Sequence, residues 1–196
     1  MSAAEDGRTD PARAVFVDRD GVINDVVLRE GRPHPPASLE GLHILPGVRE
    51  SLRALRRAGL RVIVVTNQPD VAKGVQTVGG VEAIHAELRR QLAIDDIETC
   101  FHADEDGCEC RKPKAGMLRH AAARWRIDLH SSFLVGDRWR DIAAGAAAGC
   151  QTFWIDRGYR EPRAEAPTAV VTSLAEATER ILAVLGLDSE RGEEEA

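Results

Sequence analysis

The sequence predicts an α/β fold: a mostly parallel β-sheet with helices on both faces. Two observations support this prediction, and a third bears on the number of domains. Short apolar runs without polar alternation are typical of strands that are buried on both faces. Amphipathic segments with helical spacing separate these runs. The chain of 196 residues, without an internal repeat, is long enough for one well-filled core, so we expect a single domain at residues 14–187.

The first half of this domain should contain two strands and two helices. The run AVFV at 14–17 is uniformly apolar, which predicts a buried strand. Apolar residues recur at helical spacing over 47–60, where Gly59 is a typical C-terminal stop. RVIVVT at 61–66 is rich in β-branched residues and favours a second strand. The segment 82–92 repeats the helical pattern.

The second half continues the alternation of strands and helices. The run IETCF at 97–101 predicts a weaker strand, and the pattern at 117–125 predicts a helix. SFLVG at 132–136 and TFWI at 152–155 are apolar enough for buried strands. Between them, DIAAGAAAG at 141–149 favours a helix.

The chain should close with an edge strand at 169–171 and a helix at 174–185. Residues 1–13 are polar and mixed in charge, without the apolar core of a signal peptide, so we expect a flexible N-terminus. Residues 188–196 are acidic, which predicts a disordered tail.

The composition excludes several classes of partner. The net charge of −6 argues against a surface that coats nucleic acid, which requires a basic excess. No apolar run approaches the roughly 18 to 20 residues of a membrane span. We therefore expect a cytoplasmic protein that binds neither nucleic acid nor membranes. We also expect it to be a monomer.

Polar side chains follow four of the expected strands, where the carboxyl ends of parallel strands form binding sites. Asp18 and Asp20 lie two residues apart, so an extended strand end would point both side chains the same way. Together with Asp137 they suit Mg²⁺, while the Thr66 hydroxyl and the Lys112 ammonium can donate to a phosphoryl group. Such a set favours phosphoryl transfer through a carboxylate nucleophile and a second carboxylate as general acid and base.

Each of these features also has an ordinary structural explanation. Asp and Gly are turn residues, Thr66 can cap a helix, and Asp137 can cap the helix after its strand. An isolated Lys112 would be a solvated surface charge. Their joint occurrence at four strand ends, in this order, favours a functional site.

Four segments resemble the motifs of the haloacid dehalogenase superfamily of Mg²⁺-dependent phosphohydrolases: VFVDRDGVIN, VIVVTNQ, CRKPKAG and FLVGDRWRDIAAGAAAG. The resemblance extends over about residues 14–156 and implies a Rossmann-like fold. It implies that Asp18 is the nucleophile and that Asp20 is the general acid and base. Thr66 and Lys112 would then hold phosphoryl oxygens.

The same resemblance implies a magnesium site. Asp18, the main-chain carbonyl of Asp20 and Asp137 would hold the ion, and Asp141 would support the site.

Cys100, His102, Cys108 and Cys110 form the pattern C-x-H-x5-C-x-C. Three thiolates and an imidazole are a complete tetrahedral set for Zn²⁺ without an open position for water, so the zinc loop at 100–110 should be structural. A disulfide is disfavoured in a reducing cytosol, and no redox C-x-x-C is present. An iron–sulfur centre remains an alternative, although the histidine is less natural in it. Cys150 is expected in the core.

Zinc would fix the acidic loop and, with it, the adjacent Arg111 and Lys112. The cysteine cluster resembles a branch of the superfamily that contains heptose bisphosphate and histidinol-phosphate phosphatases and replaces a large cap domain with short loops. The resemblance implies a phosphatase of a small phosphorylated sugar, with heptose 1,7-bisphosphate, cleaved at its 7-phosphate for nucleotide-heptose synthesis, as the first expectation. Histidinol phosphate or another sugar phosphate is the alternative. A non-catalytic, zinc-stabilised binding module is the alternative in which the protein is not an enzyme.

Within that branch, NQPDVAKG resembles a substrate-loop pattern, which implies substrate contacts for Asn67 and Gln68. Arg111 and Arg138 occupy positions that resemble substrate-contacting cations. The loop at 25–36 departs from the branch because it is longer and lacks a Gly-Tyr pair. Its cations either bind a second phosphate or are ordinary solvated residues: they are Arg29, Arg32 and His34.

Overall fold

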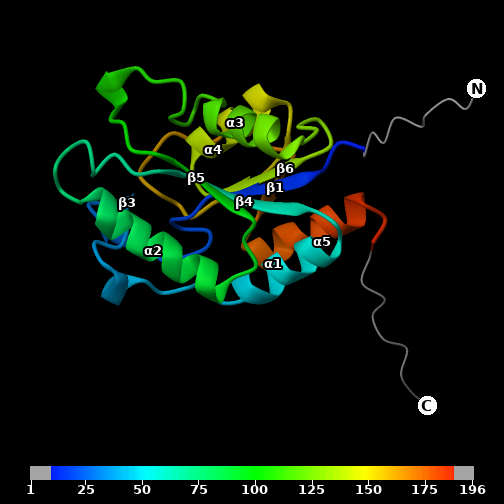
Figure 1. Cartoon of the computed structure of the whole chain (residues 1–196), viewed down its shortest axis with the longest axis horizontal. Helices are drawn as coiled ribbons and strands as arrows, with labels where there is room; N and C mark the ends of the chain where they lie inside the picture. The colour runs from blue at the N-terminus through cyan, green and yellow to red at the C-terminus, as the bar shows by residue number, and fades with distance from the viewer. Residues whose placement is uncertain (1–9, 188–196) are drawn as a thin grey trace, which may run out of the picture.

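The computed structural model describes residues 10–187, which contain a six-stranded sheet between two layers of helices (Figure 1). All neighbouring strands are parallel, in the order β5-β4-β1-β6-β7-β8. The strands are β1 (Ala14–Val17), β4 (Arg61–Asn67), β5 (Asp96–Cys100), β6 (Phe133–Gly136), β7 (Gln151–Ile155) and β8 (Ala169–Val171). The predicted fold class is confirmed.

Helices cover both faces of the sheet. On one face lie α1 (Val48–Arg57), α2 (Val78–Gln91) and α5 (Leu174–Val184), and on the other lie α3 (Gly116–Trp125) and α4 (Trp139–Ala148). Successive β1 residues face opposite layers: Val15 and Val17 pack into one apolar cluster, and Ala14 and Phe16 pack into the other. All four are fully buried, which explains the absence of polar alternation in this strand.

Helix α2 begins four residues earlier than the apolar pattern predicts. Thr77 caps it, since the Thr77 hydroxyl accepts a hydrogen bond from the Gly80 amide at 3.1 Å. The first turn contains Gly79 and Gly80, which carry no apolar side chain and therefore leave no helical periodicity in the sequence.

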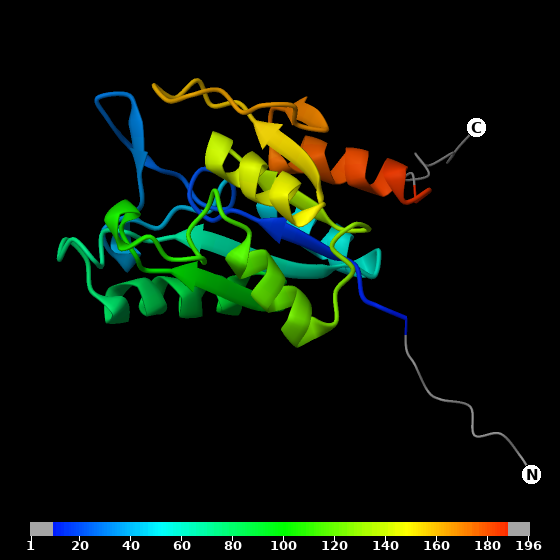
Figure 2. The same cartoon turned by 90° about the horizontal axis from the view of Figure 1, so that it is seen from above.

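The loop at 25–36 contains an antiparallel hairpin that the sequence did not predict. Its strands are β2 (Val27–Arg29) and β3 (Arg32–His34), and Arg29 pairs with Arg32. The hairpin stands apart from the sheet, beyond the carboxyl end of β1 (Figure 2). Its tip is bound to the connection between β7 and β8, because the Arg160 amide donates to the Gly31 carbonyl at 2.9 Å.

The expected flexible N-terminus and acidic tail lie mostly outside the described residues, at 1–9 and 188–196. Ala12 belongs to the folded part: its amide donates to the Arg126 carbonyl at 2.9 Å, and its carbonyl accepts from the Asp128 amide at 2.8 Å. Within residues 10–187, no helix has the length and apolar character needed to cross a membrane.

Candidate active site and metal-binding loop

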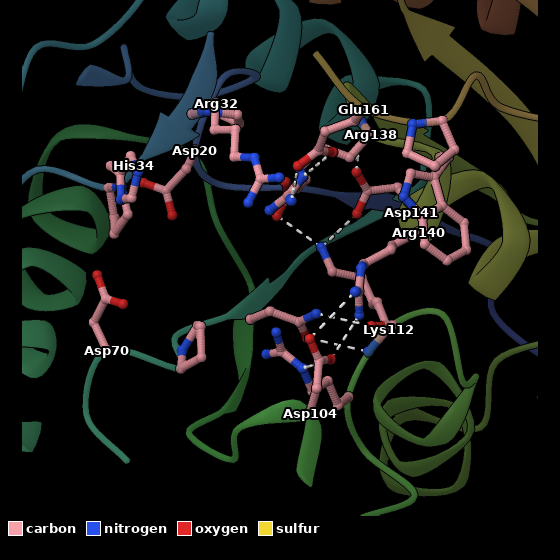
Figure 3. Close-up of a pocket in the computed structure, with 18 of the residues that line it drawn as sticks. Asp20, Arg32, His34, Asp70, Asp104, Lys112, Arg138, Arg140, Asp141 and Glu161 are labelled. Carbon is pink, nitrogen blue, oxygen red and sulfur yellow. Dashed lines mark hydrogen bonds and ion pairs between the residues drawn. The ribbon is translucent and has the colours of Figure 1, made fainter. Parts of the chain in front are cut away.

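The candidate active site lies where the strand order of the sheet reverses. β1 pairs with β4 on one side and with β6 on the other, so the loops after these strands separate and leave a crevice. A pocket of about 450 Å³ opens there, and Asp18, Asp20, Lys112 and Asp141 are among the residues that line it (Figure 3).

Three carboxylates converge beside this pocket. Asp18 follows β1, Asp137 follows β6, and Asp141 lies in the first turn of α4; all three are buried and have carboxylate oxygens within 4.8 Å of one another. The Lys112 Nζ lies 2.7 Å from Asp18 Oδ1 and 2.6 Å from Asp141 Oδ1. It also donates to the Val65 carbonyl at 2.7 Å. The structure thus brings together the residues that follow three different strands.

The charges of this cluster do not balance. Burial, together with the Asp141 charge, raises the pKa of Asp18 to about 6, although Lys112 opposes the shift. Burial and the charges of Asp18 and Asp141 raise the pKa of Asp137 well above its usual range. Burial alone would lower the pKa of Lys112, but Asp141 and Asp18 raise it to about 12. One ammonium against three carboxylates leaves a site that a divalent cation would stabilise.

The surroundings of Asp137 fit a magnesium ligand. Its Oδ2 accepts a hydrogen bond from the Tyr159 hydroxyl at 2.8 Å, and its main-chain carbonyl accepts one from Trp154 Nε1 at 3.0 Å. Its Oδ1 is buried and has no hydrogen-bond partner within residues 10–187, which is costly for a carboxylate unless a cation binds there. Sequence analysis missed Tyr159, the only tyrosine of the chain, because it lies in a loop outside every motif.

Two motif glycines allow the loops to approach so closely. At Gly21, where φ is +88°, an added Cβ would lie 1.8 Å from Asp137 Oδ2. At Gly136, an added Cβ would lie 2.2 Å from the Cβ of Asp141. The carboxylate cluster therefore requires the absence of a side chain at both positions.

Asp20 lines the pocket but lies outside the carboxylate cluster. Asp18 and Asp20 line the same pocket, although β1 ends at Val17 and only Asp18 belongs to the cluster. The Asp20 carboxylate accepts hydrogen bonds from Asn24 Nδ2 at 3.0 Å and Gln68 Nε2 at 2.8 Å. In Figure 3 it points away from Lys112 and Asp141.

A buried arginine and histidine lie behind Asp20. Arg19 is fully buried; it forms an ion pair with Asp20 at 3.0 Å and contacts His85 Nε2 through Nη1 at 3.1 Å. Burial and the Arg19 charge lower the pKa of His85 to about 4, so the imidazole is neutral and its Nε2 accepts the hydrogen bond. Sequence analysis missed this pair, because His85 occurs within an ordinary amphipathic helical pattern.

The residues that end β4 support other site residues. Asn67 brackets the backbone of Lys112: its Nδ2 donates to the Lys112 carbonyl at 3.0 Å, and its Oδ1 accepts from the Lys112 amide at 3.1 Å. The Thr66 hydroxyl is buried and accepts from Gln68 Nε2 at 2.8 Å, which leaves its own proton to donate. Gln68 differs from the expected substrate contact, since its side chain is fully buried between Thr66 and Asp20.

Both expected substrate-contacting arginines line the pocket, and both are already paired with carboxylates. Arg111 donates through Nε to Asp104 Oδ1 at 2.7 Å. Arg140, from α4, donates to the same oxygen at 2.7 Å, so Asp104 joins the cysteine loop to α4. Arg138 forms a bidentate pair with Glu161, in which Nε donates to Oε2 at 2.8 Å.

The cysteine loop brings its four expected ligands together. The Cys110 sulfur lies 3.2 Å from that of Cys100 and 3.4 Å from that of Cys108, and His102 Nδ1 lies 3.3 Å from the Cys110 sulfur. A disulfide would require about 2.05 Å. Tetrahedral ligands at about 2.3 Å from a zinc ion lie roughly 3.8 Å apart. The loop therefore has the geometry of a four-ligand metal site, whereas Cys150 is buried in the core as expected.

Comparisons with known proteins agree with this geometry. Residues 109–177 match the model of the HAD-hydrolase-like family. The D-glycero-beta-D-manno-heptose-1,7-bisphosphate 7-phosphatase of Pseudomonas putida is 36% identical over 157 residues, which cover 76% of this chain and 85% of the relative. The enzyme of the same name from Escherichia coli K12 is 32% identical over 183 residues, covering 86% and 93%.

A solved structure provides a third comparison. The D,D-heptose 1,7-bisphosphate phosphatase of B. bronchiseptica, complexed with magnesium and phosphate, superposes with a TM-score of 0.77 at 32% identity and covers 88% of this chain and 99% of its own. The chain therefore belongs to the haloacid dehalogenase superfamily of phosphatases, in the branch that contains the D-glycero-beta-D-manno-heptose-1,7-bisphosphate 7-phosphatases.

Proposed function

We propose that the protein is a Mg²⁺-dependent phosphatase that removes the 7-phosphate of D-glycero-D-manno-heptose 1,7-bisphosphate. The buried cluster of Asp18, Asp137 and Asp141 around Lys112 carries this proposal, together with the unpartnered oxygen of Asp137. The relatives described above bear the name of this activity, and a similar solved structure binds magnesium and phosphate. Nucleotide-heptose synthesis is the pathway that such an activity would serve.

In this proposal the carboxylates of Asp18 and Asp137 and the main-chain carbonyl of Asp20 hold Mg²⁺. When bound, the ion would offset the charge of the phosphoryl oxygens and orient the group for in-line attack. Asp141 keeps Lys112 in place through their ion pair, and the raised pKa of Lys112 keeps its ammonium protonated at neutral pH. Lys112 can then turn a donor toward a phosphoryl oxygen, and the free proton of Thr66 is a second donor.

The reaction would use Asp18 and Asp20 in turn. An Asp18 oxygen attacks the phosphorus and forms an aspartyl-phosphate, while the bond to the sugar oxygen breaks and Asp20 gives that oxygen a proton. Asp20 then removes a proton from a water molecule that attacks the phosphorus and releases phosphate. Asn24 and Gln68 hold the Asp20 side chain away from the carboxylate cluster in this structure, so it must rotate within the pocket wall before it can donate.

We also propose that the cysteine loop binds structural Zn²⁺ through Cys100, His102, Cys108 and Cys110. The ligand separations support a closed tetrahedral site, and a four-ligand site leaves no position for substrate. Lys112 follows two residues after Cys110, so the metal fixes the segment that carries this ammonium.

Phosphate release from purified protein tests the proposed function. We expect turnover of heptose 1,7-bisphosphate with Mg²⁺, loss of turnover when Mg²⁺ alone is omitted from zinc-loaded protein, and recovery when it is restored. Histidinol phosphate, run in parallel, should be a much poorer substrate. The matched control is Asp18→Asn, which removes the nucleophile but keeps the shape of the site. Phosphate release from no phosphomonoester at all would instead support a non-catalytic binding module.

A further inference from the structure

Two carboxylates of the cluster each have one oxygen occupied by a protein donor and one oxygen free. Lys112 Nζ donates to Asp18 Oδ1 at 2.7 Å, and the Tyr159 hydroxyl donates to Asp137 Oδ2 at 2.8 Å. The second oxygens, Asp18 Oδ2 and Asp137 Oδ1, accept no hydrogen bond within residues 10–187. A cation in the cluster would therefore find one free oxygen on each of these two carboxylates.

The third carboxylate has protein partners at both oxygens. Asp141 Oδ1 lies 2.6 Å from Lys112 Nζ, and Asp141 Oδ2 accepts a hydrogen bond from the Arg138 amide at 3.0 Å. The number of carboxylate oxygens that can reach a cation is thus set by hydrogen bonds within the protein. Of these bonds, the one from Tyr159 is the only one described here that comes from outside the motif segments.

The connection between β7 and β8 holds Tyr159 against Asp137. Arg157, in the same connection, donates to the Gly21 carbonyl through Nε at 3.2 Å and Nη2 at 2.9 Å. A Cβ added at Gly21 would lie 1.8 Å from Asp137 Oδ2 and 2.8 Å from the Tyr159 hydroxyl, so the three groups are in close contact. Trp154, in β7, fixes the Asp137 backbone through its hydrogen bond to the main-chain carbonyl at 3.0 Å. The hydroxyl and the carboxylate are therefore both held in place.

Magnesium and calcium differ in what they require of a carboxylate. Mg²⁺ demands near-ideal octahedral geometry, with ligands at about 2.0 to 2.1 Å, and keeps several waters. Ca²⁺ takes about six to eight oxygens at about 2.3 to 2.6 Å, and carboxylates often bind it through both oxygens. Since Tyr159 occupies Oδ2, Asp137 can offer a cation only Oδ1. That arrangement suits Mg²⁺ and denies Ca²⁺ a bidentate ligand.

We propose that Tyr159 is a positioning residue that makes the site selective for Mg²⁺ over Ca²⁺, because its hydroxyl keeps Asp137 a monodentate ligand. This inference rests on the magnesium site of the proposed function. It adds a determinant of cation choice that lies in the connection between β7 and β8, outside every sequence motif. Calcium should compete poorly with magnesium for the wild-type protein and better once the hydroxyl is removed.

The test is Mn²⁺ binding to zinc-loaded protein without substrate, followed by the electron paramagnetic resonance signal of free Mn²⁺. Mn²⁺ accepts the same octahedral oxygen ligands as Mg²⁺, and its displacement by Mg²⁺ or by Ca²⁺ gives the dissociation constant of each. The variant is Tyr159→Phe, which removes the hydroxyl but keeps the ring. We expect the ratio of the Ca²⁺ dissociation constant to the Mg²⁺ dissociation constant to fall at least about fivefold.

The matched control is Thr168→Val, which removes a hydroxyl from the same connection. Thr168 Oγ1 accepts a hydrogen bond from the Thr152 amide at 3.0 Å. Thr168 directly precedes β8, so it lies at the amino ends of the parallel strands, opposite the site. This variant should keep the wild-type ratio. Asp137→Ala should lose the Mn²⁺ binding that the other proteins show, which assigns the signal to this site.

An unchanged ratio in Tyr159→Phe would overturn the inference, even if both affinities fell, because equal losses are what a merely structural role predicts. Wild-type protein that binds no divalent cation at Asp137 would overturn it as well. Failure of the proposed function alone looks different: wild-type protein would bind Mg²⁺ yet release phosphate from no substrate. The ratio of the two dissociation constants would still decide the role of Tyr159 in that event.

Discussion

The carboxylate cluster and the cysteine loop both bring potential metal ligands within 4.8 Å of one another, but different forces hold them. Asp18, Asp137 and Asp141 are all buried, and each is attached to a strand or helix of the apolar core. In the cysteine loop, Cys100 is buried at the end of β5, whereas the short helical turn at Asp104–Asp106 has no buried residue.

This difference indicates what each site requires. The core fixes the carboxylates even though their charges oppose one another, so the cluster is preformed before a cation binds. The cysteine loop buries little apolar surface, and four metal–ligand bonds would have to supply what packing does not. In this proposal, the sheet holds the first region, which would place a metal; a metal would hold the second region, which would place Lys112.

The largest expected effect comes from the region held by the sheet. Asp18→Asn should lower kcat at least about 1,000-fold, because an amide is a far poorer nucleophile than a carboxylate. Circular dichroism should match the wild type, because the core is untouched. Substantial turnover by the purified variant would remove Asp18 from the nucleophile role.

Asp20→Asn is the companion experiment. It should also impair turnover severely, and it should slow hydrolysis of the phosphoenzyme more than its formation, since the proposed mechanism has Asp20 activate the attacking water. Rapid-quench experiments should then find phosphorylated protein during turnover. Its absence at every time point would contradict this order of steps.

In the region held by the metal, Cys108→Ser and Cys110→Ser should each abolish zinc binding. We expect circular dichroism close to wild type, earlier proteolysis within residues 100–114, and activity lowered at least about tenfold, because Lys112 loses its fixed position. Added Mg²⁺ should not restore it. Cys150→Ser is the control that should retain zinc. Wild-type protein without zinc, or zinc-free variants with unchanged kcat and KM, would contradict the comparison.

The sequence predicted these two regions unequally well. Uniformly apolar runs identified the strands, and strand order in a parallel sheet is enough to bring Asp18, Asp137 and Lys112 to one edge. The hydrogen bonds from Asn24 and Gln68 to Asp20 could not be predicted, because they depend on a turn closed by a hydrogen bond from the Gly21 amide to the Asn24 carbonyl. Contacts between distant segments had no local signal either.

The hairpin and Tyr159 are two such cases. The hairpin strands span three residues each, too few for a pattern of alternation, and the tip is held by a contact with residue 160. Tyr159 reaches Asp137 from the connection between β7 and β8, whose sequence matches no motif. The hairpin lines the pocket and Tyr159 contacts a carboxylate of the neighbouring cluster, yet neither feature follows from local propensity.

His85 provides a smaller test of the buried region. Its pKa of about 4 in the folded state lies below its ordinary value of 6.5, because of burial and then Arg19, while Glu82 opposes the shift. The unfolded chain therefore binds the proton more readily. The contribution of neutral His85 to the free energy of unfolding is therefore fully present above pH 6.5. It is lost as pH falls toward 4, by roughly 2 to 3 kcal/mol in total.

The measurement is urea unfolding at pH 7.5 and pH 5. His85→Gln should lose part of the difference in unfolding free energy between the two pH values. His120→Gln removes a histidine whose side chain is 67% exposed, and it should keep that difference. Equal pH dependence in all three proteins would show that burial of His85 carries no such cost.

The smallest expected effect concerns Asp104, which joins the cysteine loop to α4 through Arg111 and Arg140. Its side chain is 54% exposed, and such ion pairs contribute only about 0 to 1 kcal/mol, less in high salt. If zinc is the dominant restraint, Asp104→Asn should retain zinc, change KM less than about threefold, and accelerate amide hydrogen exchange only in the loop.

The control is Glu105→Gln, which lies in the same helical turn and forms no ion pair in the described residues. Raising the salt concentration should reduce the difference in loop exchange between wild type and Asp104→Asn, because salt screens the wild-type ion pairs. Comparing the activity of Asp104→Asn with that of Cys108→Ser then shows whether the ion pairs or the metal hold the cysteine loop in place. Suppose that Asp104→Asn impairs activity as strongly as Cys108→Ser while zinc remains bound. The ion pairs to α4, and not the metal, would then position Arg111 and Lys112. In that case the distinction between a region held by the sheet and one held by a metal fails.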